Sequence, residues 1–143
     1  MTNADTEQGR FMFEEWHRRT AAADLQGLLD LYAEDVTFES PLVPRLLDRE
    51  SGVVTGKDDL RSFFLLARGG PPRNLARGFR TGAFQFDGRT PVWEYPRATP
   101  NCDQFDLAES MDLQDGRIVH HRVYWGWKGA PILCNRSTFP SPH

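Results

Sequence analysis

Two ionisable side chains, Glu109 and His121, occur in stretches whose other residues suggest a buried position. Both stretches alternate apolar and polar residues with a period of two, which is typical of a β-strand with one face in the core. Glu109 falls on the same face as Leu107 and Met111, and His121 on the same face as Val123. Burial favours the uncharged form of a carboxyl group, and histidine titrates near neutral pH. Glu109 and His121 are therefore candidates for general acid and base catalysis.

Both residues also have a purely structural interpretation. A histidine on an apolar strand face is more often a core residue with satisfied hydrogen bonds than a catalyst, and the face that carries Glu109 could be exposed at that end of the sheet. His120 shares its face with Arg122 and Tyr124 and should point to the side opposite His121. The alternation alone does not decide which histidine faces a cavity.

Ser40 is a third polar candidate, because it shares a strand face with Val36 and Phe38. A serine hydroxyl cannot remove a carbon-bound proton without a base of its own, so Ser40 would orient a substrate carbonyl together with the indole N–H of Trp16. Aromatic and apolar residues could form the walls of a site for a ring-containing ligand, although such residues more often only fill a core. These candidate ligand-binding residues are Trp16, Tyr32, Phe38, Trp125, Val123 and Met111.

The stretch DLQGLLDLYAEDVTFESP changes from helical to strand periodicity, so a short helix should lead directly into the strand that ends at Ser40. Helices are predicted near residues 8–23, 24–34 and 56–67. Four further strands, joined in part by turns at Asp87-Gly88 and Asp115-Gly116, are predicted at residues 78–86, 91–95, 103–113 and 117–127. Residues 42–54 are expected to form a long loop near the core, as lids often do.

This order of elements predicts an α+β fold, in which three N-terminal helices wrap a curved, mostly antiparallel sheet. The 143 residues are expected to form a single domain, with an irregular tail at residues 128–143. A strongly twisted sheet wrapped by helices leaves a conical cavity with apolar walls, which suits a small hydrophobic molecule.

Composition excludes several classes of partner. The net charge of −3 argues against nucleic acid, and no apolar run approaches the roughly 20 residues that cross a membrane. The polar N-terminus has no signal-peptide pattern, so a cytoplasmic location is expected, with Cys102 and Cys134 as buried free thiols. We find no motif for a metal site and none for a phosphate-binding cofactor.

Three stretches, DLQGLLDLYAEDVTFESP, TGKDDLRSFF and DGRIVHHRVYW, resemble the nuclear transport factor 2-like superfamily in its SnoaL-like branch, with ketosteroid isomerases and polyketide cyclases. The resemblance runs from about Phe11 to Trp127. It implies a cone-shaped α+β barrel that commonly forms a dimer. Because this superfamily includes isomerases, dehydratases, epoxide hydrolases, cyclases and non-catalytic transport factors, the resemblance implies the fold more than the function.

Carried over residue by residue, the ketosteroid isomerase pattern is not met. The position of the general base holds Ser40, the position of the oxyanion-hole tyrosine holds Trp16, and the acidic partner falls near Glu109. The resemblance also implies that the face of His121 lines the cone, while the face of His120 meets a dimer partner or solvent. Ketosteroid isomerisation by the usual mechanism is therefore not expected.

The function that these residues favour is a small cofactor-independent enzyme that transfers protons on a hydrophobic, ring-containing carbonyl compound as an isomerase, cyclase or dehydratase. In this hypothesis Glu109, His121 and Ser40 are the catalytic candidates. A non-catalytic ligand-binding or dimerisation module is the alternative, and an epoxide hydrolase, which would need an acid–arginine–acid cluster, is a third possibility. We expect a homodimer through the convex face of the sheet.

Overall fold

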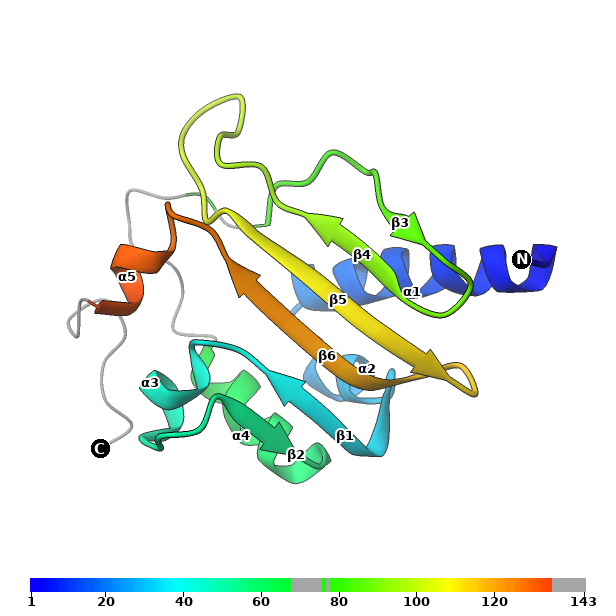
Figure 1. Cartoon of the computed structure of the whole chain (residues 1–143), viewed down its shortest axis with the longest axis horizontal. Helices are drawn as coiled ribbons and strands as arrows, with labels where there is room; N and C mark the ends of the chain where they lie inside the picture. The colour runs from blue at the N-terminus through cyan, green and yellow to red at the C-terminus, as the bar shows by residue number, and fades with distance from the viewer. Residues whose placement is uncertain (68–75, 77, 135–143) are drawn as a thin grey trace.

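The computed structural model describes residues 1–67, 76 and 78–134. Within these described residues, four helices and two strands make up the first half of the chain, and strands dominate the second half (Figure 1). The elements are α1 (Asn3–Ala21), α2 (Leu25–Leu29), β1 (Tyr32–Glu39), α3 (Val43–Leu47), β2 (Val53–Thr55), α4 (Lys57–Ala67), β3 (Gln85–Phe86), β4 (Pro91–Glu94), β5 (Leu107–Gln114), β6 (Arg117–Trp125) and α5 (Ala130–Cys134). The predicted α+β class is confirmed.

The strands form one six-stranded sheet in the order β2-β1-β6-β5-β4-β3. Strands β1 and β6 pair in parallel, and the other pairings are antiparallel, as predicted for a mostly antiparallel sheet. The strand order begins at β2 and ends at β3 without a pairing between them, so the sheet is open rather than a closed barrel. Helices α1, α2 and α4 lie on one face of the sheet, and we call this face the inner face (Figure 1).

Helix α1 begins at Asn3, earlier than the predicted residue 8, because a capping box holds its first turn. The Thr2 hydroxyl accepts the Asp5 amide, and the Asp5 carboxylate accepts the Thr2 amide. Helix α2 is a single short helix whose start is capped by the Asp24 carboxylate, which accepts the Gly27 amide at 3.0 Å. The caps thus set the start of both helices.

The second helix is shorter than the predicted 24–34, and Tyr32 already belongs to β1. Tyr32 pairs with Ile118 of β6, and the Ile118 amide donates to the Leu31 carbonyl. Pairing with a buried neighbouring strand therefore outweighs the helical spacing of the leucines before it. Along β1, Val36, Phe38 and then Ser40 are buried, as the alternation predicted.

The prediction of a strand over residues 78–86 is wrong except at its end, where β3 spans Gln85–Phe86. The predicted strand 103–113 begins later, at Leu107. The fully buried side chain of Gln104 replaces the hydrogen bonds that a neighbouring strand would make. It accepts a hydrogen bond from the Phe79 amide and donates to the carbonyls of Phe79 and Pro96. These bonds satisfy backbone groups that a strand would otherwise pair.

Residues 42–54 are not a loose loop. They contain α3 and β2, and Val43, Leu46 and Val54 from this segment are buried in the core. Helix α5 occupies part of the tail predicted to be irregular. The helix predicted near residues 56–67 is confirmed as α4. The tail beyond residue 134 lies outside the described residues. The two cysteines, expected to be buried, are free but exposed.

Candidate active site

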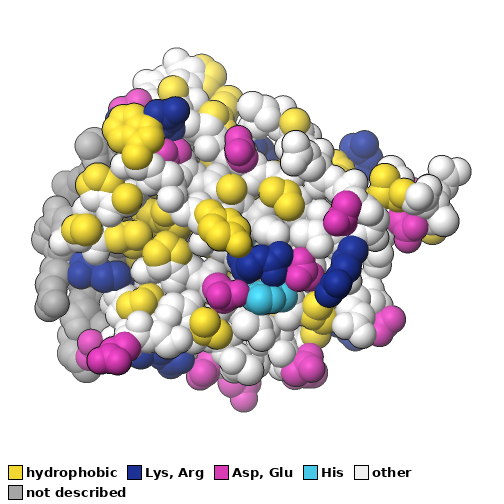
Figure 2. Space-filling view, viewed as in Figure 1, with side chains coloured by type: hydrophobic (Ala, Val, Ile, Leu, Met, Phe, Trp, Pro, Cys, Tyr) yellow, Lys and Arg dark blue, Asp and Glu magenta, His cyan; other side chains and the backbone are white. Residues whose placement is uncertain are grey.

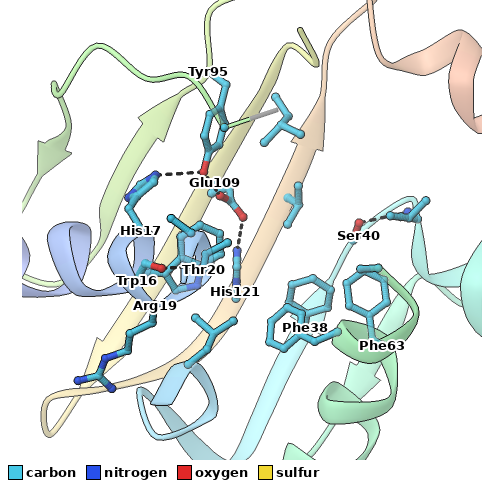
Figure 3. Close-up of a pocket in the computed structure, with 18 of the residues that line it drawn as sticks. Trp16, His17, Arg19, Thr20, Phe38, Ser40, Phe63, Tyr95, Glu109 and His121 are labelled. Atoms are coloured by element: carbon cyan, nitrogen blue, oxygen red, sulfur yellow. Dashed lines mark hydrogen bonds and ion pairs between the residues drawn. The ribbon is translucent and has the colours of Figure 1, made fainter. Parts of the chain in front are cut away.

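A cavity of about 500 Å³ lies between the helices and the inner face of the sheet, a size that suits a small molecule (Figure 3). Its wall is mainly aromatic and apolar, with a few polar side chains. The aromatic members are Trp16, Phe38, Phe63, Phe64, Phe105 and Trp125. The polar side chains, which come from α1, from β5 and β6 and from the residues that directly follow β1 and β4, include His17, Ser40, Tyr95, Glu109 and His121.

Glu109 on β5 and His121 on β6 meet in this wall. The two strands are antiparallel neighbours, with Glu109 opposite Val123 and His121 opposite Met111, so the pair lies diagonally on the same face. His121 Nε2 lies 3.0 Å from Glu109 Oε1, and the side chains are 0% and 6% exposed. A carboxyl group and an imidazole are thus held together out of bulk water.

A chain of two hydrogen bonds fixes the proton of His121. Trp16 Nε1–H, which can only donate, donates to the Tyr32 hydroxyl at 2.9 Å. The Tyr32 hydroxyl, 2.9 Å from His121 Nδ1, then donates its own hydrogen to that nitrogen. Burial, the largest cause, raises the pKa of Tyr32 well above its ordinary value, so Tyr32 remains a donor. His121 consequently carries its proton on Nε2 and donates it to Glu109.

The second oxygen of Glu109 is bound from the opposite side. The Tyr95 hydroxyl donates to Glu109 Oε2 at 2.7 Å, and it is itself 3.2 Å from the donor Trp93 Nε1 and 3.1 Å from His17 Nε2. Burial first, and then the charge of Glu109, raises the pKa of Tyr95 well above its ordinary value. Figure 3 shows the Glu109 carboxyl group between Tyr95 and His121.

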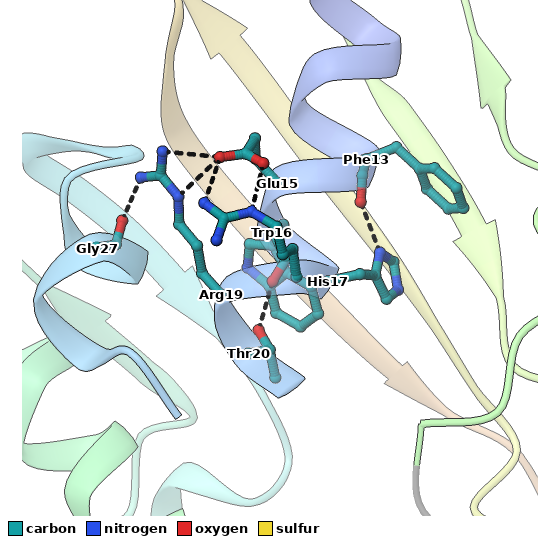
Figure 4. Close-up of polar contacts among 8 residues, drawn as sticks. Phe13, Glu15, Trp16, His17, Arg19, Thr20 and Gly27 are labelled. Atoms are coloured by element: carbon teal, nitrogen blue, oxygen red, sulfur yellow. Dashed lines mark hydrogen bonds and ion pairs between the residues drawn. The ribbon is translucent and has the colours of Figure 1, made fainter. Parts of the chain in front are cut away.

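His17 completes this network from α1. Its Nδ1 lies 2.7 Å from the Phe13 carbonyl oxygen, which can only accept, so Nδ1 carries a proton (Figure 4). Burial is the largest cause that lowers the pKa of His17, and the Arg80 guanidinium lowers it further. The Phe13 hydrogen bond and the charge of Glu109 oppose this shift.

The end of α1 is tied to α2 by a cluster beside the cavity (Figure 4). Arg18, followed by Arg19, holds the pKa of Glu15 at about 2 through hydrogen bonds to its carboxylate. Arg19 also donates to the Gly27 carbonyl. Because Arg19 lines the cavity, this cluster sets the position of the wall that α1 and α2 form.

Most of the predicted site residues line the cavity, but not all in the predicted manner. Those in the wall are Trp16, Phe38, Ser40, Glu109, His121, Val123 and Trp125. Tyr32 and Met111 are fully buried outside it, and Tyr32 instead holds His121. The N–H of Trp16, predicted to orient a carbonyl, is already bound to Tyr32. Ser40 accepts the Leu42 amide at 3.1 Å and lies beyond Phe38, away from Glu109 (Figure 3).

Sequence reasoning missed Tyr95 and His17. A signal for Tyr95 was present, because Trp93 and Tyr95 alternate in the strand PVWEY and so share a face. His17 follows Trp16 and lies one helical turn after Phe13, but nothing in the sequence links it to a strand 78 residues later. Only the packing of α1 on β4 reveals that contact.

Within the part of the chain that the structure describes, no group of three or more His, Cys, Asp and Glu side chains is placed to hold a metal ion. Among the same residues, no helix combines the length and the apolar character needed to cross a membrane.

A family model for the SnoaL-like domain matches residues 13–121. This match covers most of the chain, including the helices and strands that carry Trp16, Glu109 and His121. The chain therefore belongs to the SnoaL-like domain family.

Solved structures of the nuclear transport factor 2-like fold are similar to this chain. An NTF2-like protein of unknown function from Burkholderia xenovorans LB400 has 20% identity, with a TM-score of 0.63 over 85% of this chain and 84% of that one. A candidate ketosteroid isomerase from Kribbella flavida DSM 17836 has 18% identity and a TM-score of 0.59, over 84% and 78% of the two chains. The epoxide hydrolase/cyclase-like enzyme SalBIII, described in pyran ring formation of the polyether salinomycin, has 19% identity and a TM-score of 0.58, over 86% and 94%. At these identities the likeness shows the fold alone.

A comparison with curated proteins found no significant match.

Proposed function

We propose that this protein is a small cofactor-independent enzyme that transfers protons on an uncharged, ring-containing carbonyl compound, with Glu109 as the general acid or base. The observation that carries this proposal is the position of Glu109. Its side chain lines an aromatic cavity, is 6% exposed, and has one carboxyl oxygen bound by His121 and the other by Tyr95. A positioned carboxyl group of this kind suits isomerisation, cyclisation or dehydration, which all need a proton removed and another delivered.

The neighbours of Glu109 support a role in proton transfer rather than in charge pairing. Its two partners, a histidine and a tyrosine, can each donate a hydrogen bond to the carboxylate. Neither carries the permanent charge of an arginine or a lysine, which would keep Glu109 ionised throughout a reaction. The group can therefore change its protonation state during a cycle.

The side chains of the cavity wall indicate the shape and the polar groups of the ligand. Flat rings such as Trp16, Phe38 and Trp125 favour a planar or fused-ring compound, which they can contact face or edge on. Ser40, separated from Glu109 in the same cavity, is placed to contact a second polar group at the other end of such a compound. A ligand with a carbonyl group near Glu109 and a hydroxyl or second carbonyl near Ser40 fits both.

Exchange of carbon-bound protons tests this proposal without knowledge of the natural product. Cyclic and aryl ketones, including tetralones and steroid enones, are incubated in D₂O with the protein, and loss of the α-proton signal is followed by ¹H NMR. Wild type should accelerate exchange for at least one compound, and Glu109→Gln should slow it by about 100-fold or more. Glu39→Gln, on the other face of the sheet, is the matched control and should retain the wild-type rate.

A non-catalytic ligand-binding module is the second candidate, and one observation favours it. Every polar atom of the Glu109–His121 pair already has a hydrogen bond, as expected of a stable buried network. In that case compounds from the panel would bind, as seen by shifts of tryptophan indole signals, but neither wild type nor Glu109→Gln would accelerate exchange.

Epoxide opening is included in the same experiment because the similar SalBIII structure is described as epoxide hydrolase/cyclase-like. Among the described residues, the hydrogen-bond partners of Glu109 are His121 and Tyr95, and neither is the arginine that an acid–arginine–acid cluster needs. Aryl epoxides in the panel would therefore be opened only if Glu109 itself protonates the epoxide oxygen, and Glu109→Gln should abolish that reaction.

A further inference from the structure

Three hydrogen bonds converge on the Tyr95 hydroxyl, which has one hydrogen and two lone pairs. Trp93 can only donate, so it uses one lone pair. One hydrogen and one lone pair remain for two partners, His17 Nε2 and Glu109 Oε2. Since Nδ1 of His17 already carries a proton for the Phe13 carbonyl, only two arrangements satisfy every group.

In the first arrangement His17 is doubly protonated and donates to Tyr95, and Tyr95 donates to the Glu109 carboxylate. In the second, the Glu109 carboxyl group is protonated and donates to Tyr95, and Tyr95 donates to neutral His17. The step between them moves two protons: the Nε2–H bond of His17 breaks as Tyr95 gains that proton, and the original Tyr95 O–H bond breaks as Glu109 Oε2 gains the other. One positive and one negative charge are replaced by two neutral groups.

We propose that His17, Tyr95 and Glu109 hold one shared proton, and that His17 is a positioning residue that stores this proton for Glu109. The catalytic meaning of this relay rests on the proposed function, but its titration is a property of the protein without substrate. Glu109 would act as a base in the first arrangement and as an acid in the second, without exchange with solvent.

Burial and neighbouring charges act in opposite directions on the His17 end of the relay. On the His17 side, burial and the Arg80 guanidinium disfavour the imidazolium, while the Phe13 carbonyl and Glu109 favour it. Arg80 lies over the Phe13 ring, 4.4 Å from its centroid, from the segment that precedes β3. On the other side, Glu109 faces His121, whose tautomer is set by Tyr32 and Trp16 and which donates to the carboxyl group in both arrangements.

NMR titration of the full chain tests this relay, with ¹⁵N-labelled histidine and ¹³C-labelled glutamate carboxyl groups. In wild type, His17 and Glu109 share one proton. Its loss should therefore change the NMR signals of both residues at one common midpoint pH. Neutral His17 should be the Nδ1–H tautomer. Glu109→Gln supplies a permanent amide donor to Tyr95, so His17 should remain neutral to a pH about one unit lower or more than in wild type.

Tyr95→Phe removes the shared hydroxyl while it keeps the ring, and it should separate the midpoints of His17 and Glu109. The matched control is Tyr124→Phe, the same change at an exposed position on the other face of the sheet, which should leave their common midpoint in place. Separate midpoints in wild type would overturn the relay, and so would a common midpoint that survives in Tyr95→Phe. If Tyr95→Phe does not fold, the shift of His17 in Glu109→Gln decides alone. A common midpoint without ketone exchange would support the relay and reject the proposed function.

Discussion

Two histidine–glutamate pairs are formed by neighbouring residues of β6, and only their surroundings differ. His121 pairs with Glu109 on the inner face, where the side chains are 0% and 6% exposed. His120 pairs with Glu39 on the outer face, where they are 35% and 41% exposed. The same two residue types thus form a buried network on one side of the sheet and a partly exposed hydrogen-bonded pair on the other.

The outer face has other charged partners beside His120. Arg122 donates to both carboxylate oxygens of Asp112 and to the Ser110 hydroxyl, and Arg122 is the first cause that lowers the pKa of Asp112. Figure 2 shows histidine, acidic and basic side chains side by side on this face. The more accessible His120–Glu39 pair contributes only about 0–1 kcal/mol, since water solvates the separated side chains almost as well. Burial, not residue type, therefore distinguishes the candidate site.

Replacing His121 or His120 by alanine should give the largest difference in stability between the two faces of the sheet. His121→Ala leaves Tyr32 and Glu109 buried without a partner and opens a cavity, so we expect a loss of about 3 kcal/mol in the free energy of unfolding. His120→Ala should cost less than about 1 kcal/mol. Urea denaturation at pH 7 measures both, and equal losses would contradict the comparison.

Removing a tyrosine hydroxyl should also cost more stability on the inner face than on the outer face, but the difference should be smaller than for the histidines. Tyr32→Phe removes the acceptor of Trp16 and the donor to His121, with an expected cost of about 1.5 kcal/mol. Tyr124, 57% exposed on the outer face, is the matched position, and Tyr124→Phe should stay within about 0.5 kcal/mol of wild type. The comparison fails if Tyr124→Phe is the more damaging change.

Mild acid should weaken the inner face through His17. Its pKa is lowered by burial, so in Glu109→Gln, in which the relay cannot form, the unfolded chain binds more protons than the folded chain below about pH 6.5 and stability falls as the pH falls. The substitutions below are therefore compared in the Glu109→Gln background. One proton limits this slope to about 1.4 kcal/mol per pH unit. Between pH 6.5 and 5 the effect should be absent in His17→Phe, as measured by urea denaturation at several pH values.

The range between pH 6.5 and 5 also distinguishes the titration of His17 from that of the acidic groups on the outer face. Asp112, with its lowered pKa, contributes stability that is present above its ordinary value near 3.8 and is lost as the pH falls below it. Asp112→Asn should therefore leave the slope between pH 6.5 and 5 unchanged. A slope that persists in His17→Phe and vanishes in Asp112→Asn would reverse the assignment.

The homodimer expected from the sequence stays a prediction, and it assigns the outer face to a second copy of the chain. Light scattering at micromolar concentration should give about twice the chain mass of 16.4 kDa. Tyr124→Glu should weaken the dimer about fivefold, roughly 1 kcal/mol, while Tyr124 is too exposed to affect the inner cavity. A monomer of 16.4 kDa for wild type would reject this prediction.

Sequence patterns predicted the strands that carry the candidate site. The Asp115-Gly116 turn joins β5 and β6 with positive φ angles of 52° and 76° at both residues, as a two-residue hairpin requires. Simple alternation from this turn would pair Glu109 with Arg122 and so place it on the face of His120. A register shift between Asp112 and Leu113 instead pairs Met111 with His121 and brings His121 to the face of Glu109. The turn and the strands were therefore predictable from local sequence, but the pair also depends on this irregularity.

Contacts across long distances in the chain were not predictable in the same way. Tyr32 holds His121 over a separation of 89 residues, because β1 pairs in parallel with β6. The helical spacing of the leucines before it favoured a helix at Tyr32, so its role was assigned to the cavity wall instead. Gln104 likewise replaces a strand ladder through side-chain bonds that no period in the sequence indicates.

By itself, the sequence determined that the chain is α+β, that a two-residue turn joins β5 and β6 in a hairpin, and that Glu109 and His121 each share a strand face with apolar residues. These features depend on side-chain period and turn geometry, which act over a few residues. Only the tertiary structure decided that Tyr95 and His17 reach Glu109 and that Trp16 and Tyr32 set the tautomer of His121. Those contacts exist because helix α1 packs across the sheet, and the direction of a buried hydrogen bond depends on every partner that this packing brings together.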